Sequence, residues 1–165
     1  MITLWQGNPA LKWGLIFGLP LGVLGAINTL LLFKGAPGVG NLPQFAVVMV
    51  IFFAAGLLAA RETGEVAKGG LAGLIGATLA TALSGLLDVV LVLVAPRAYA
   101  FMAGFDKLGN QPGTLLLTVI FGLLISLIVY AAFGCAVGAL GGLAGRRLAP
   151  PAAGASPQSG GQRSA

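Results

Sequence analysis

Residues Gly69–Val94 read GGLAGLIGATLATALSGLLDVVLVLV, an apolar run interrupted by a single acidic residue, Asp88. A helix needs roughly 20 apolar residues to cross the hydrocarbon core of a bilayer, and this run exceeds that length. Three more apolar runs contain no Asp, Glu, Lys or Arg: Trp13–Phe33, Leu42–Ala60 and Thr114–Gly145. The sequence therefore predicts an all-α, polytopic membrane protein, a four-helix bundle with spans at about 13–33, 43–60, 69–94 and 114–145 joined by short loops.

The composition excludes several classes of protein. Of the 165 residues, 58% are hydrophobic and 8% are charged, whereas soluble domains carry about 25% charged residues. The net charge of +5 comes from Lys and Arg scattered between the apolar runs and beyond them, so we expect no nucleic-acid partner. There is no His, and the Gly-rich stretches lack the Lys-Ser/Thr ending of a phosphate loop. We expect no metal, cofactor, nucleotide or catalytic residue, and hence no enzyme.

Two segments outside the spans carry expectations of their own. Residues 1–145 form one transmembrane domain, and 146–165 begin with Arg146 and Arg147 before turning rich in Pro, Ala, Gly, Ser and Gln. This tail cannot bury enough apolar surface to fold, so we expect it to be disordered. In the connection Ala95–Gly113, part of the loop is expected to lie at the membrane surface through Tyr99, Phe101, Met102 and Phe105.

The distribution of basic residues predicts the orientation. Four crossings place six of them on one side, and Lys34, Arg97 and Lys107 on the other. Because basic residues are enriched in cytoplasmic loops, we expect both termini in the cytoplasm. The expected location is a bacterial cytoplasmic membrane, with the lipid bilayer as the main partner. The six residues on the cytoplasmic side are Lys12, Arg61, Lys68, Arg146, Arg147 and Arg163.

Small residues recur at steps of four on three of the predicted helices. Such stripes allow two helix backbones to approach closely in lipid. The bundle needs only part of them, so the stripe through 134–142, next to the cytoplasmic tail, is expected to remain available for a homo-oligomer or a larger membrane complex. The predicted packing residues are Gly14, Gly18, Gly22, Gly69, Gly73, Gly134, Gly138 and Gly142.

Asp88 is the one residue whose position is costly. It lies about 9 Å from the middle of its run, and a charged side chain at a helix centre costs roughly 2.5–3.5 kcal/mol, falling toward the interface. Asn28 lies about 8 Å outward on the first helix, at a similar depth. Ser84 is one turn from Asp88 on the same face, so Asp88, Asn28 and Ser84 form the candidate intramembrane polar site. Further partners on the fourth helix are Thr118, Ser126 and Tyr130.

Two functions are compatible with this polar site. An interhelical hydrogen bond would make Asp88 structural, and we expect a structural or accessory membrane component held together by small-residue contacts. The alternative is a small channel or transporter whose polar site is Asp88 with Asn28. A membrane enzyme would need at least two convergent polar groups near one interface, which Asp88 alone does not supply.

The connection between the second and third helices carries a resemblance. Residues 59–73, AARETGEVAKGGLAG, have an Ala-rich helix end, an Arg-x-Thr-Gly turn and a Gly-x-x-Ala-Gly helix start. This hairpin resembles one in small four-helix bacterial integral membrane proteins of unknown function. The resemblance covers this hairpin alone and implies a bacterial membrane protein of four helices. It transfers no activity and no catalytic residue.

Overall fold

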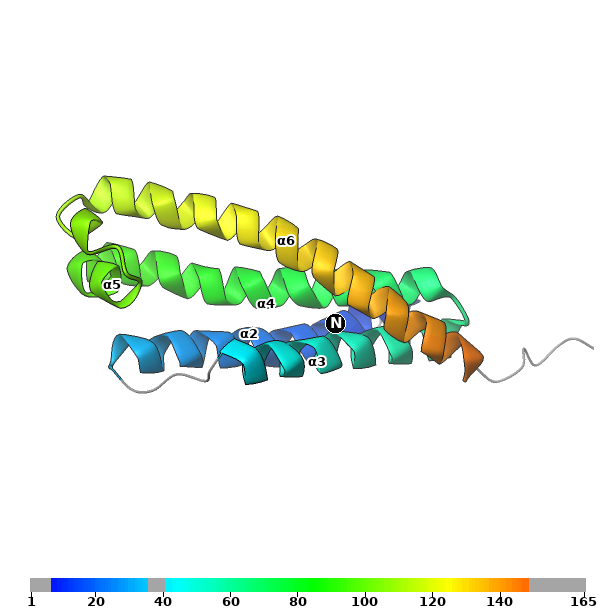
Figure 1. The fold of residues 1–165 in the computed structure, drawn as a ribbon. Helices are drawn as coiled ribbons and strands as arrows, with labels where there is room; N and C mark the ends of the chain where they lie inside the picture. Colours follow the sequence, from blue (N-terminus) through cyan, green and yellow to red (C-terminus); the bar gives the residue numbers. More distant parts are fainter. Residues whose placement is uncertain (1–6, 36–40, 149–165) are drawn as a thin grey trace, which may run out of the picture.

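The computed structural model describes residues 7–35 and 41–148, and these form a bundle of helices with no strand among them (Figure 1). The all-α prediction is confirmed. The expected disorder of the tail concerns 149–165, which lie outside the described residues. In chain order the elements are α2 (Pro9–Phe33), α3 (Asn41–Thr63), α4 (Val66–Val94), α5 (Pro96–Met102), the 3-10 helix η1 (Asp106–Leu108) and α6 (Pro112–Arg147).

The four long helices extend beyond the apolar runs that predicted them. Helix α2 begins at Pro9 because Pro suits the first helical position and the Asn8 side chain accepts a hydrogen bond from the Ala10 amide at 3.2 Å. Helix α6 also begins at a proline, Pro112, and continues to Arg147. By length and composition all four can cross a membrane, which is compatible with a multi-pass membrane protein. Large apolar side chains such as Ile128 (72% exposed) and Val50 (67%) face outward, as lipid-facing residues do.

We call the end of the bundle that holds the α3–α4 connection the charged end, because an ion pair joins two helices there. Lys12, near the start of α2, forms an ion pair with Glu62 at the end of α3, with Nζ and Oε1 2.9 Å apart. Such exposed ion pairs contribute little stability. This one shows that the two segments lie next to each other. The start of α2 and the α3–α4 connection therefore lie together, and α5 lies at the opposite end (Figure 1).

Glycines bring α4 and α6 into backbone contact in the half of the bundle near that charged end. A Cβ atom on Gly134 would lie 2.5 Å from both the Gly73 carbonyl oxygen and the Ala77 methyl group, and one on Gly138 would lie 2.6 Å from the Gly69 oxygen. The expectation that the 134–142 stripe stays available for self-association is therefore wrong. Gly69 and Gly73 of α4 have the same spacing of four residues and cover the stripe, so it is buried within the chain.

The other small-residue stripe joins α2 to α4. Gly14, Gly18 and Gly22 are buried, and a Cβ on Gly18 would lie 2.7 Å from the Cα of Gly76. Helix α4 thus uses two adjacent faces, one toward α2 and one toward α6, and becomes the centre of the bundle (Figure 1).

Candidate functional site

A cavity of about 740 Å³ lies in the half of the bundle toward α5, with walls from α2, α3, α4 and α6. It is located where the glycine contacts end. Phe45, the first α3 residue whose side chain is described, contacts Phe133 near the middle of α6, with ring centroids 5.3 Å apart. On the α5 side of this contact, the helices leave a partly open space instead of meeting backbone to backbone. Residues of α6 before Phe133 form one wall of the cavity.

The structure brings the predicted polar residues to this one cavity. Asn28 of α2, and Ser84 and Asp88 of α4, all line it. The further partners suggested for α6, Thr118, Ser126 and Tyr130, line it as well. These groups therefore lie at compatible depths in the bundle, while their role as a functional site stays a prediction.

The hydroxyl groups around Asp88 are partly engaged within their own helices. Ser84 Oγ donates to the carbonyl oxygens of its own helix, Ala80 at 3.0 Å and Thr81 at 3.2 Å. Thr118 Oγ1 donates to the Thr114 carbonyl oxygen at 2.9 Å. These hydroxyl oxygens keep lone pairs that can accept from a ligand, but their hydrogens are already used.

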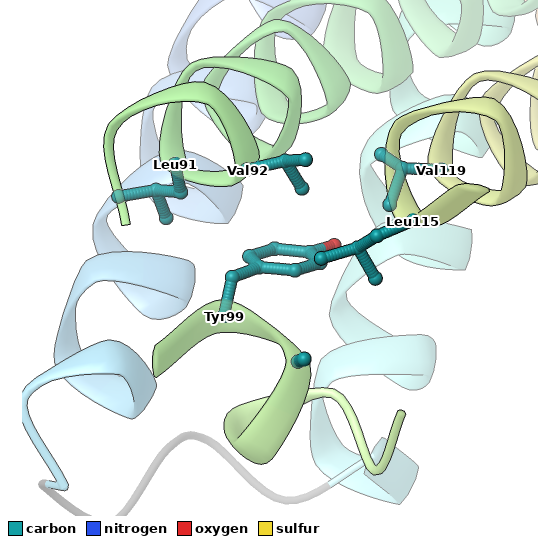
Figure 2. Packing of buried hydrophobic residues seen from close by; sticks show 6 residues of the cluster. Leu91, Val92, Tyr99, Leu115 and Val119 are labelled. Carbon is teal, nitrogen blue, oxygen red and sulfur yellow. The ribbon is translucent and has the colours of Figure 1, made fainter. Parts of the chain in front are cut away.

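Tyr99 lines the cavity, although its sequence position predicts a place at the membrane surface. The short helix α5 turns its ring into the bundle, where it is 7% exposed. Figure 2 shows the ring beneath Leu91 and Val92 of α4, with its hydroxyl directed toward Leu115 and Val119 of α6. A signal was present: Pro96 suits a helix start, and Tyr99 and Met102 lie three residues apart on one face.

The surroundings of Tyr99 affect its titration. Burial, and to a lesser extent the negative charge of Asp88, raise the pKa of Tyr99 to about 12. The folded protein therefore favours the neutral phenol more strongly than an unfolded chain does. Stability from this group is complete below pH 10, the ordinary tyrosine value, and is lost as the pH rises toward 12.

We expect wild-type protein to lose about 1–2 kcal/mol of stability between pH 10 and 12, and Tyr99→Phe to remove that loss. Phenolate absorbance in a Tyr130→Phe background, where Tyr99 is the one tyrosine, measures its pKa directly. In the same background, Asp88→Asn should lower the pKa of Tyr99. The decrease should be smaller than the increase that burial causes, because the charge of Asp88 is the lesser of the two causes. An unchanged Tyr99 titration in Asp88→Asn would contradict an electrostatic contact between the two side chains.

The hairpin that carries the family resemblance forms the end of α3, the turn after it and the start of α4, with Gly64 in the turn at a φ of 73°. Its geometry bears on the fold and not on the cavity, which lies at the other end. Membership in that group of proteins stays a prediction. In comparisons with protein families, curated proteins and solved structures, no match to this chain was found.

Proposed function

We propose that this chain is a multi-pass protein of a bacterial cytoplasmic membrane that binds a small solute inside its helix bundle, as a small transporter or channel does. The observation that carries the proposal is the cavity, because polar side chains from α2, α4 and α6 line it together with Asp88. A bundle that needed Asp88 only as a helix contact would gain nothing from surrounding it with empty space. The proposal includes cytoplasmic termini, supported by the six-to-three distribution of basic residues. It assigns binding to the cavity and no catalysis.

The second candidate is a structural or accessory membrane component. What favours it is the half of the bundle near the charged end, where α3, α4 and α6 are held backbone to backbone by glycines such as Gly56 against Gly138. The two candidates differ in one physical property. A solute cavity must admit water, whereas a structural bundle keeps its interior dry.

Thiol labelling measures that difference, because a maleimide reacts with the thiolate, which forms where water reaches the sulfur. The chain has one cysteine, so Cys135→Ala gives a thiol-free background. In that background we compare Ser126→Cys, in the cavity wall, with Ile125→Cys, its neighbour on the lipid-facing side (62% exposed). In nanodiscs, a charged, membrane-impermeant maleimide should label Ser126→Cys at least about tenfold faster.

A third variant ties the labelling to the cavity. Gly122 lies one turn before Ser126 and lines the same cavity, and a Cβ there meets nothing within 4 Å. Gly122→Phe should fill the space and slow labelling of Ser126→Cys, while Gly113→Phe, also with open space around it but away from the cavity, should not. If Ser126→Cys reacts as slowly as Ile125→Cys, the interior is dry and the structural candidate replaces the proposal.

A further inference from the structure

The charge of the cavity has one sign. Asp88 is the one charged side chain among the described residues that line it. The sequence holds no charged residue between Lys34 and Arg61, so the adjoining first part of α3 brings none. Arg97, which follows α4 on the chain, borders a separate surface hollow between Ala95 and Pro112. A carboxylate facing a space without a basic side chain favours a positively charged occupant.

The hydrogen-bonding capacity of the cavity points the same way. Because Ser84 and Thr118 donate to their own backbones, both present oxygen lone pairs rather than hydrogens to the space. Together with the Asp88 carboxylate they form a wall rich in acceptors. Asn28, Ser126 and Tyr130 add donors to the same wall, so these acceptors favour a cation or a hydrogen-bond donor only together with the charge of Asp88.

Aromatic rings occupy much of the remaining wall. They come from three helices, α3, α5 and α6, and from the segment after α5, so no single helix supplies them. Ring faces attract cations that have lost part of their hydration, by about 0.5–2 kcal/mol each. The rings belong to Phe45, Phe52, Tyr99, Phe105 and Tyr130.

The size and ligand set argue against a metal ion. Cavities of about 300–1,000 Å³ accommodate organic molecules, and this one measures about 740 Å³. A Ca²⁺ ion requires six to eight oxygen ligands at short distance. Within the described part of the chain, no three His, Cys, Asp or Glu side chains lie close enough to hold a metal. The occupant must fill the space with its own apolar surface.

We propose that the cavity binds a hydrophobic organic cation with one positive charge, with the Asp88 carboxylate as its counter-ion. The inference rests on the proposed function and adds the chemical class of its solute. The aromatic rings and the aliphatic walls take up the apolar surface of the cation, and Asp88 supplies the opposite charge. The Ser84 and Thr118 oxygens contribute acceptors to the same lining.

The test uses the full chain in nanodiscs of zwitterionic lipid and two probes of the same shape and opposite charge, tetraphenylphosphonium and tetraphenylborate. Calorimetry should give saturable binding of the phosphonium ion at one per chain and no saturable binding of the borate ion. Asp88→Asn should weaken phosphonium binding at least tenfold. Asp106→Asn, which removes an exposed carboxylate outside the cavity, should bind as the wild type does.

If Asp88→Asn does not fold, variants that fill the cavity give an independent test. Gly122→Phe should abolish phosphonium binding, and Gly113→Phe should preserve it. Equal binding of both ions, or full binding by folded Asp88→Asn, would overturn the inference. If Ser126→Cys labels rapidly and the phosphonium ion does not bind, the cavity proposal stands and the cation class is wrong. If neither labelling nor binding occurs, both fail.

Discussion

Gly134→Leu is expected to destabilise the bundle by about 3 kcal/mol or more, the largest effect of any single substitution considered. Overfilling a packed interior typically costs about 1–3 kcal/mol and sometimes more. Here even a Cβ atom would lie 2.5 Å from the Gly73 carbonyl oxygen and the Ala77 methyl group. A backbone oxygen cannot change rotamer to make room, so α4 and α6 must separate. Because interhelical stability in lipid comes mainly from close packing, that separation removes it.

The matched control is Gly122→Leu, the same change three turns earlier on α6, where a Cβ meets nothing within 4 Å. Its stability should remain within about 0.5 kcal/mol of the wild type. Unfolding in mixed micelles of increasing SDS content, followed by circular dichroism, compares the two midpoints. Coincident midpoints for Gly134→Leu and Gly122→Leu would mean that α4 and α6 do not meet through their glycines.

The glycine contacts also mark what the sequence could predict. Steps of four small residues predict that a helix face is closely approached, and Gly73 and Gly134 are approached in this way. A stripe does not name its partner, since any helix with a matching face satisfies it. For this reason the sequence alone does not distinguish self-association of the 134–142 stripe from its contact with Gly69 and Gly73 of the same chain.

In the candidate site, too, features set by the local sequence could be predicted, whereas features set by long-range packing could not. Asp88 and Asn28 were matched in depth because helical rise is fixed per residue. The cavity they share depends on where α3 meets α6, through Phe45 and Phe133, and this long-range pairing has no local signal. For Tyr99 the local signal is short: Pro96 and the spacing of Tyr99 and Met102 indicate a helix, but the direction in which its face turns depends on tertiary packing.

Phe52→Ala is expected to cost about 3 kcal/mol, the low end of the range for a buried Phe, because lipid instead of water surrounds the separated helices. The Phe52 side chain is 1% exposed and lies between Ala77 of α4 and Val137 of α6, at the boundary between the cavity and the glycine-packed half. Removing its ring would extend the cavity into that half and remove one of the contacts of Ala77 and Val137.

The adjacent residue supplies the control, because Phe53 is 39% exposed on the outer side of α3 and Phe53→Ala removes the same ring from a lipid-facing position. Its cost should stay within about 0.5 kcal/mol. The same SDS titration measures both variants. Equal losses would mean that burial inside the bundle contributes nothing beyond contact with lipid, and Phe52 would not close the inner end of the cavity. A large loss for Phe52→Ala alone would show that the Phe52 ring packs between α4 and α6 at the inner end of the cavity.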